Sequence, residues 1–415
     1  MQHATHDTRY ERKTLTLMGL SFGLVGLDRW IIAPLFPQIL QDLGLNYQQL
    51  GNLIGILSLT WGGCAIVMGR LADRIGRKKI LVVTMVAFSA LSGLSGLATG
   101  FASLMLIRAA MGVAEGAFTP ASVVATGEAS LPSRLGFNQG LQMSMFSLLG
   151  LGFAPIIATQ LLQVLPSWHW VFMVSSVPGL ITAVLIARTL RNDAPAPVGA
   201  SAQPGAGSGR LLRSRNVMLA TLAVLCAMAG IFVISAMVPV YLEHVLKLST
   251  QDMGFVVSAI GFGGFVGSFG LAALSDRVGR KPAAIGAFVG AAVLVYAFAQ
   301  TGANPKLLFA LLFGLSVCAL GLLGLIAGPI ATEAAPVGLI ASSVGFVAGV
   351  GEIFGGGLAP ALAGYVAQHF GLPYMLHVAL GGFVCGGVVS LFLIETAPSR
   401  QRGPGVAALG AGLDQ

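Results

Sequence analysis

Charged residues are scarce in this chain. Only 9% of its 415 residues are Asp, Glu, Lys or Arg, whereas a soluble domain carries about 25%. So few charges cannot give a chain of this length a water-facing surface, which excludes ordinary soluble domains. The abundant residues fit a membrane instead. Hydrophobic residues make up 55%, the mean hydropathy is +0.85 and there are 57 glycines, and membrane helices use small residues to pack closely.

The sequence also lacks clustered cysteines and the motifs of catalysis. Cys64, Cys226, Cys318 and Cys385 each stand alone in an apolar run, so neither a disulfide framework nor a zinc site is predicted. No nucleophile–base pair, metal cluster or phosphate-binding loop supports an enzyme, and we expect no cofactor. The formal charge of +8 would indicate nucleic acid in a soluble protein. In this chain the positions of the basic residues indicate membrane topology instead, as described below, and we expect no nucleic-acid partner.

Long apolar stretches recur along the whole chain. A helix that crosses a bilayer needs roughly 20 mostly apolar residues, and twelve such stretches occur, six before a polar break and six after it. The first follows basic residues, as a signal peptide does, but it is too long and lacks a small-residue cleavage site, so we expect it to remain attached. The predicted spans are residues 15–38, 49–69, 80–99, 101–125, 137–163, 168–188, 217–242, 253–274, 284–302, 307–331, 339–365 and 373–394.

The basic residues are distributed very unevenly over the connections between these spans. With the N-terminus on the cytoplasmic side, outer loops contain only Lys247 and Lys306, and Arg29 and Arg108 lie inside spans. Insertion retains basic loops in the cytoplasm, so this bias predicts an even number of helices with both termini inside. The other 19 of the 23 basic residues are Arg9, Arg12, Lys13, Arg70, Arg74, Arg77, Lys78, Lys79, Arg134, Arg188, Arg191, Arg210, Arg213, Arg215, Arg277, Arg280, Lys281, Arg400 and Arg402.

The polar break has the composition of a linker. Residues 192–209 (NDAPAPVGASAQPGAGSG) are rich in Pro, Ala, Gly and Ser and cannot bury enough apolar surface to fold alone. We therefore divide the chain into a cytoplasmic tail at 1–14, a first bundle at 15–190, a cytoplasmic linker at 191–216, a second bundle at 217–396 and a disordered cytoplasmic tail at 397–415.

One basic loop occurs twice. Residues 69–79 read GRLADRIGRKK and residues 272–281 read AALSDRVGRK, aligned at a constant offset of 203 residues. Two independent basic anchors would explain the Lys and Arg residues, but not Asp73 and Asp276, or Gly76 and Gly279, in register. Duplication of a six-helix unit explains all of them.

These loops, together with twelve spans and a central linker, resemble the major facilitator superfamily. The first copy meets that family's loop pattern almost fully, while the second has Ala272 in place of its first glycine. The resemblance implies an all-α membrane protein with twelve transmembrane helices in two pseudo-symmetric six-helix bundles, and a substrate site at mid-membrane between them. It also implies that the loop aspartates help to close the inner side. The gating residues it gives are Gly69, Asp73, Arg74, Gly76, Arg77, Asp276, Arg277, Gly279 and Arg280.

Four charged residues lie inside spans of the first half. They are Asp28 and Arg29 in the first span and Arg108 and Glu115 in the fourth. A charge at the bilayer centre costs about 2.5–3.5 kcal/mol on insertion scales, so we expect these side chains to face the interior. Arg108 and Glu115 share one helix face about 10.5 Å apart, so each should find a partner elsewhere. They could form a static ion-pair cluster, or a site where Arg29 or Arg108 attracts an anion while Asp28 and Glu115 exchange protons.

The same residues resemble one branch of the superfamily more closely. The first-span GLDRW, the fourth-span RAAMGVAEGAF and the PSWHWVF at 166–172 are similar to the anion:cation symporters, which take up sugar acids and related carboxylates with protons. Spinster-like lipid transporters have a similar pattern and are the second choice. Trp168, His169 and Trp170 fit an interfacial aromatic belt better than a site.

The second half contains one unexplained acid within its spans, Glu352 in the glycine-rich eleventh span. It could be a third proton site, a partner for Arg29, a ligand for a cationic substrate, or a neutral carboxyl bonded to backbone. Gln142 in the fifth span and Tyr241 in the seventh are weaker candidates for substrate binding, as are Asn138 and Gln139.

These observations favour a secondary active transporter that carries a small organic anion, such as a sugar acid or an aromatic acid, into the cell together with protons by alternating access. Proton-driven export of drugs or lysolipids is the alternative. Drug antiporters typically have paired glycines in the fifth span, which reads GFAPIIA at residues 152–158 here. A channel would not need a duplicated gate loop, and we expect no attached sensor domain. The expected partners are the anion, protons and lipid, with the chain monomeric in a bacterial-type inner membrane.

Overall fold

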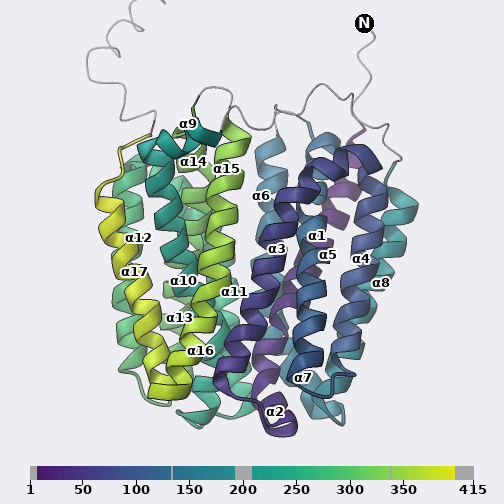
Figure 1. The fold of residues 1–415 in the computed structure, drawn as a ribbon, viewed down its shortest axis with the longest axis vertical. Helices are drawn as coiled ribbons and strands as arrows, with labels where there is room; N and C mark the ends of the chain where they lie inside the picture. Colours follow the sequence, from purple (N-terminus) through teal and green to yellow (C-terminus); the bar gives the residue numbers. More distant parts are fainter. Residues whose placement is uncertain (1–6, 132–133, 192–207, 337–338, 398–415) are drawn as a thin grey trace, which may run out of the picture.

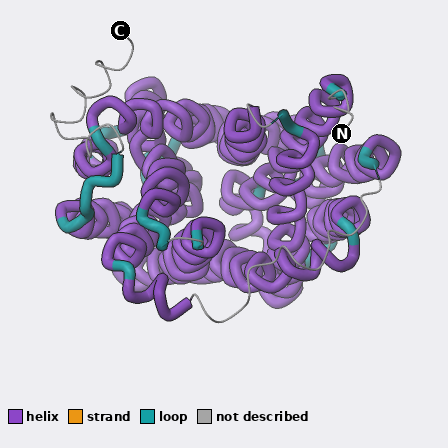
Figure 2. Tube along the Cα trace, turned by 90° about the horizontal axis from the view of Figure 1, so that it is seen from above, coloured by secondary structure: helices purple, strands orange, loops and turns teal. Residues whose placement is uncertain are grey.

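The computed structural model describes residues 7–131, 134–191, 208–336 and 339–397. These residues form helices and short connections, without a strand among them. Figure 1 shows the helices standing side by side, with the first part of the chain on one side and the second part on the other. The view from above in Figure 2 shows the helices nearly end-on.

The first half contains six spans. Its elements are α1 (Thr8–Trp30) continued by α2 (Ile32–Leu43), α3 (Tyr47–Ile75), α4 (Arg77–Ser95), α5 (Phe101–Ala129), a span made of α6 (Leu135–Met145), the π-helical η2 (Phe146–Phe153) and α7 (Ala154–Val164), and α8 (Trp168–Thr189).

The second half repeats this order after the short helix α9 (Ser208–Arg213). Its elements are α10 (Arg215–His244), α11 (Thr250–Val278), α12 (Arg280–Ala299), α13 (Pro305–Leu325) with η3 (Ile326–Ile330) and α14 (Ala331–Glu333), a span made of α15 (Ile340–Val350), the π-helical η4 (Gly351–Leu358) and α16 (Ala359–Phe370), and finally the turn η5 (Leu372–Tyr374) with α17 (Met375–Leu391).

Eleven of these helical segments are long and apolar enough to cross a membrane. The 29-residue α3 occupies the place of the predicted second span, so the count is twelve. The predicted spans are confirmed, although most helices extend several residues further. The first begins at Thr8, not at residue 15, because the Asp7 side chain accepts a hydrogen bond from the Tyr10 amide (3.0 Å) and caps the helix. Within the predicted linker, α9 is helical, while residues 192–207 and the tail from 398 onward lie outside the described residues.

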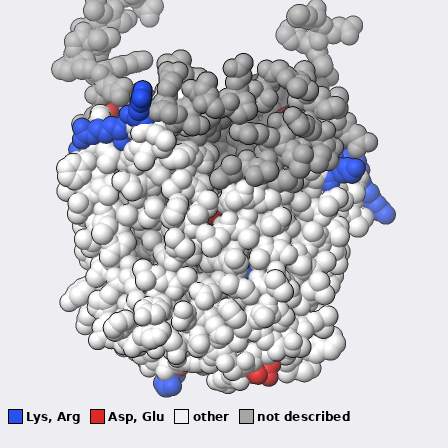
Figure 3. All heavy atoms as spheres, in the orientation of Figure 1, with Lys and Arg blue, Asp and Glu red and all other residues white. Residues whose placement is uncertain are grey.

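Large apolar side chains cover the outside of the two bundles. Leu106, Val164 and Phe370 are 73%, 76% and 66% exposed, as expected for side chains that face lipid. Figure 3 shows a belt almost free of charged atoms, with Lys and Arg gathered mainly near the end where α1 begins. We call this end the basic end and the opposite one the far end. The distribution agrees with the loop asymmetry of the sequence.

The two halves pack through glycine. A Cβ on Gly51 would lie 2.2 Å from the Pro360 carbonyl oxygen, and one on Gly261 would lie 1.8 Å from the Gly152 amide nitrogen. Only glycine permits such close approach, as is usual between membrane helices. Hydrogen bonds add to these contacts at the far end. The Tyr47 hydroxyl lies 3.1 Å from His244 Nδ1, and the Tyr47 amide donates to Gln368 (3.2 Å).

Candidate functional site

Arg29 lies on α1, buried at the boundary between the two halves, and is 3% exposed. Its Nη2 donates to the Ser58 hydroxyl on α3 (2.6 Å) and forms an ion pair with Glu352 on η4 of the second half. Several interpretations of Glu352 were left open by the sequence, and this ion pair agrees with the one in which Glu352 is the partner of Arg29. This ion pair joins the two bundles about midway along their helices.

Aromatic rings surround the Arg29 guanidinium. Its Cζ lies 5.2 Å from the ring centroid of Phe232 on α10, and 5.8–5.9 Å from those of Trp30, Trp61 and Phe146. Rings at this distance attract a cation through their π faces. They also keep water away, so an anion that reaches Arg29 interacts with it more strongly than it would in water.

Arg108 on α5 is fully buried and caps α1. Its Nη1 and Nη2 donate to the backbone carbonyl oxygens of Asp28 (3.2 Å) and Arg29 (2.6 Å). Both carbonyls belong to the last turn of α1, where backbone oxygens have no partner inside the helix. A cation at this end also interacts favourably with the helix dipole. Arg108 thus fixes the backbone that presents Arg29.

The two carboxyls of the first half have different surroundings. Asp28 accepts a hydrogen bond from the Ser92 hydroxyl on α4 (2.8 Å). Glu115 is fully buried, and neither of its side-chain oxygens has a hydrogen-bond partner among the described residues. It lies close enough to Arg29, Arg108 and Glu352 for charge interactions. A carboxyl in this position is free to gain or lose a proton without breaking a hydrogen bond.

The formal charges of this cluster do not cancel. Asp28, Glu115 and Glu352 contribute three carboxyls, and Arg29 and Arg108 contribute two guanidiniums. The sum is −1 when all five are ionised. An uncompensated buried charge is costly, so one proton on a carboxyl brings the cluster to neutrality.

The structure does not bring every predicted residue to this cluster. Gln142 is buried on α6, where its amide nitrogen donates to the Ser122 hydroxyl on α5 (2.9 Å). Asn138, one turn earlier, donates to Glu11 on α1 (2.8 Å). Tyr241 packs near Phe298 inside the second half and lines a cavity of about 110 Å³ with Val295 and His377. It lies roughly 13 Å along α10 from Phe232, so it is not next to Arg29.

Trp170 and Trp168 both lie at the far end, at the start of α8, but only Trp170 is exposed there (51%), whereas the Trp168 side chain is buried. Its indole nitrogen donates to Asp42 (3.0 Å), and its ring stacks on His169. Within the described ranges, no group of three or more His, Cys, Asp or Glu is arranged to hold a metal ion.

The first copy of the gate loop is only partly described. The side chains of Gly69, Asp73 and Arg74 lie outside the described residues. Gly76 precedes α4 with φ +94°, a conformation that other residues rarely adopt. Arg77 forms an ion pair with Glu128 at the end of α5.

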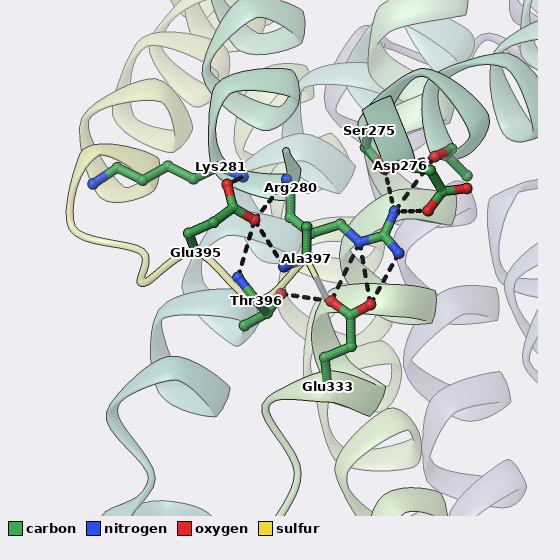
Figure 4. A network of polar contacts seen from close by, with 9 residues as sticks. Ser275, Asp276, Arg280, Lys281, Glu333, Glu395, Thr396 and Ala397 are labelled. Carbon is green, nitrogen blue, oxygen red and sulfur yellow. Dashed lines mark hydrogen bonds and ion pairs between the residues drawn. The ribbon is translucent and has the colours of Figure 1, made fainter. Parts of the chain in front are cut away.

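The second copy is described fully and forms the network in Figure 4. Gly279 has φ +105°, which explains why glycine occurs in register in both loops. Arg280 pairs with Asp276 (2.5 Å) and, through Nη2, with Glu333 at the end of α14 (2.9 Å). Arg277 is exposed.

The segment after α17 completes this network. Both carboxylate oxygens of Glu395 accept hydrogen bonds from the first amides of α12, those of Arg280 (2.8 Å) and Lys281 (3.2 Å). The Thr396 hydroxyl donates to Glu333 (2.6 Å). The helix start and the buried ion pair are therefore both held by the chain beyond the last span.

Sequence reasoning missed several of these partners. Glu128 and Glu333 follow the two loops at nearly the same offset, 205 residues apart, so extending the repeat comparison would have found them. Ser58, Ser92 and Phe232 had no such signal, because single serines and phenylalanines are common in membrane helices. Their roles depend on helix rotations that a single sequence does not fix.

Comparisons with known proteins agree with this geometry. Residues 18–353 and 220–413 match the model of the Major Facilitator Superfamily. A probable 4-methylmuconolactone transporter of Cupriavidus pinatubonensis is 26% identical over 87% of this chain and 85% of its own length. A probable sulfoacetate transporter of Cupriavidus necator is 25% identical over 91% of this chain and 93% of its own.

The fold also occurs among solved structures. A bacterial homolog of the human lysosomal transporter Spinster, in an inward-facing and occupied conformation, superposes with a TM-score of 0.72 at 18% sequence identity, covering 92% of this chain and 94% of its own. At this identity the likeness concerns the fold alone. The twelve spans, the duplicated loops and the family match lead to one conclusion: the chain belongs to the Major Facilitator Superfamily and is a multi-pass membrane transporter, not an enzyme.

Proposed function

We propose that this transporter carries a small organic anion, in particular a carboxylate, into the cell together with protons. The observation that supports it most directly is Arg29, a buried cation between the two halves whose charge is matched by a carboxylate of the opposite half. In alternating access, the substrate binds at this boundary and both bundles rearrange around it.

A carboxylate is the substrate group that fits Arg29 best. A guanidinium binds a carboxylate through charge-assisted hydrogen bonds, which are stronger than neutral ones. The relatives named for 4-methylmuconolactone and sulfoacetate transport support a small organic acid as the substrate. Aromatic rings around Arg29 favour an acid with a planar or apolar body over a highly hydroxylated one.

Proton coupling follows from the charge of the cluster. A substrate anion adds one more negative charge to a cluster whose three carboxyls already exceed its two guanidiniums. A proton that enters through Glu115 or Asp28 offsets that addition and travels with the substrate. The buried Glu115, without a hydrogen-bond partner among the described residues, is the better placed of the two.

We also propose an orientation. The basic end faces the cytoplasm of a bacterial-type cell, with both termini inside, so the far end faces outward. Glycine contacts and hydrogen bonds close the two halves at the far end. This arrangement corresponds to a conformation from which substrate exchanges with the cytoplasm.

Uptake into proteoliposomes tests the proposal. Labelled benzoate, gluconate and 4-methylmuconolactone are offered with a pH gradient, acid outside, and again without it. We expect at least one anion to accumulate above equilibrium only when the gradient is present. Uptake that ignores the gradient would contradict symport. Expulsion of a cationic dye or a lysolipid under the opposite gradient, without anion uptake, would establish export instead.

A further inference from the structure

Glu352 occupies the position that a substrate carboxylate would take on Arg29. Its carboxylate is the acidic partner of the guanidinium, and Ser58 is the neutral one. It is 4% exposed, and it comes from the half that otherwise contributes apolar side chains around Arg29, such as Phe232.

We infer that Glu352 is a built-in competitor for the substrate, and that an incoming carboxylate replaces it on Arg29 while Glu352 takes up a proton. This inference rests on the proposed function and adds to it a role for the second half. One proton would then be bound each time an anion is bound, because the two carboxylates cannot both be charged beside one guanidinium.

Charge balance gives the reason. In the empty protein, Arg29 and Glu352 form a pair with no net charge. When the substrate carboxylate bonds to Arg29 and the Glu352 contact breaks, an ionised Glu352 would remain buried without a partner, which is strongly unfavourable. With a proton on Glu352, the site again sums to zero: one guanidinium, one substrate carboxylate and one neutral carboxyl.

Arg29 on α1 contacts Glu352 directly, and Glu115 on α5 lies within range of a charge interaction with it. The elements packed against η4 are α10, α3, α16 and α15. Among their described side chains, the charged ones are Arg215 and Glu243, which lie near the two ends of α10, away from Glu352.

The remaining titratable side chains of those packed elements point elsewhere. On α10, the backbone of Cys226 packs against Gly382 of α17, and Glu243 lies near the far end beyond Tyr241. The hydroxyl of Tyr47 on α3 meets His244 at the far end. On α16, Tyr365 and His369 contact each other. None of these groups competes with Glu115 as the neighbour of Glu352.

The local backbone also permits Glu352 to move. Glu352 is the second residue of the π-helical η4, followed by Gly355, Gly356 and Gly357. Single π-helical turns are frequent at functional sites. A Cβ on Gly356 would lie 2.6 Å from the Phe232 ring and 3.2 Å from Glu352 Oε1, so the glycine keeps open the space beside the carboxyl.

Binding measured as a function of pH tests the inference. The affinities of purified wild type and Glu352→Gln for benzoate, gluconate and 4-methylmuconolactone are determined between pH 5 and 9. The wild-type Kd should rise by about tenfold per pH unit, as the uptake of one linked proton on binding requires. The Glu352→Gln variant should bind more tightly at high pH, with less than about a twofold change over the range.

Two variants serve as controls. Glu243→Gln removes a carboxyl of the second half away from Arg29, and should keep the wild-type pH dependence. Ser58→Ala removes a neutral partner of Arg29, and should weaken binding equally at every pH.

A second measurement covers the case in which Glu352→Gln does not fold. Anion binding to the wild type in a weakly buffered solution, followed with a pH indicator, should remove about one proton per anion from the solvent. No proton uptake, or a pH dependence that persists in Glu352→Gln, would overturn the exchange while leaving anion transport standing. Failure of the wild type to bind any of the three anions would overturn both proposals.

Discussion

Two helices related by the internal repeat show how the halves have diverged. The α5 segment, Phe101–Ala129, and the span from Pro305 to Glu333 are each 29 residues long. A shift of 204 residues, which aligns Phe101 with Pro305, places Leu312 opposite Arg108 and Ala319 opposite Glu115. All four side chains are buried, so the difference is one of chemistry and not of position.

The same two helices remain alike at the basic end. Glu128 pairs with Arg77 in the first half, and Glu333 pairs with Arg280 in the second. The two halves thus remain alike at the gate loops, where an arginine of each loop pairs with a glutamate at the end of a neighbouring helix. It is lost at mid-membrane, where only the first half has the charges that hold α1 and Arg29 in place.

Replacing Arg108 of α5 by leucine, the residue that its counterpart Leu312 has in the second half, should reduce stability and transport more than any other change considered. Arg108→Leu removes the cap from the last turn of α1 and leaves Asp28 and Glu115 with less positive charge nearby. We expect a loss of about 3–5 kcal/mol in stability and no transport, measured by thermal unfolding in detergent and by anion uptake. The matched change Leu312→Met, which conserves volume, should cost less than about 1.5 kcal/mol. Equal losses in the two variants would contradict the asymmetry.

Glu115→Gln tests the same helix without removing a cation. It should abolish accumulation driven by the proton gradient, because the amide cannot carry a proton, while exchange of labelled for unlabelled anion remains measurable. Both activities are followed in the same proteoliposomes. Loss of exchange together with accumulation would assign Glu115 a structural or binding role instead.

The two gate pairs should differ in strength. The Arg280 side chain is 8% exposed and also bonds Ser275 and Asp276, whereas Glu128, the partner of Arg77, is 45% exposed. We expect Arg280→Gln to cost about 2–3 kcal/mol and Arg77→Gln about 1 kcal/mol or less, compared by thermal unfolding. A larger cost for Arg77→Gln would show that the first gate depends on contacts other than Glu128.

The smallest effect concerns pH and Glu395. Burial raises the pKa of this carboxyl, but hydrogen bonds from the Ala397, Arg280, Lys281 and Thr396 amides outweigh burial and hold the pKa below its usual range. A lowered pKa stabilises the folded state above the ordinary value of about 4.3, and this contribution is lost as the pH falls through the folded pKa. Solvent screening should keep it below about 1 kcal/mol. The difference in Tm between wild type and Glu395→Gln should therefore shrink from pH 7 to pH 3.5, and a constant difference would contradict the assignment.

Much of the fold could be predicted because it depends on composition and repetition. The twelve spans follow from apolar length, and the register of the gate glycines follows from the offset of 203 residues. Asp28, Arg29, Arg108 and Glu115 stand out because charges inside spans are rare. Glu352 was recognised for the same reason, although its partner was left open.

The pairing within the site could not be predicted in the same way. Whether Arg29 or Arg108 faces the second half depends on how α1 and α5 are rotated, and neither rotation can be inferred from spacing. Arg108 was a candidate for substrate binding, whereas in the structure its guanidinium bonds the carbonyls of Asp28 and Arg29. The location of Tyr241 depended on the bundle geometry in the same way.

The segment after α17 has a consequence for biosynthesis. Glu395 bonds Arg280 across 115 residues of chain, so the basic end of the second half can be completed only after the ribosome has added the whole of that intervening sequence. At about 5–20 residues per second, this takes roughly 6 to 23 seconds. During that interval the first amides of α12 lack the Glu395 carboxylate, and a nascent chain that stops before Glu395 never acquires these bonds. Insertion into the membrane can therefore be complete while these contacts of the second gate loop are still unformed.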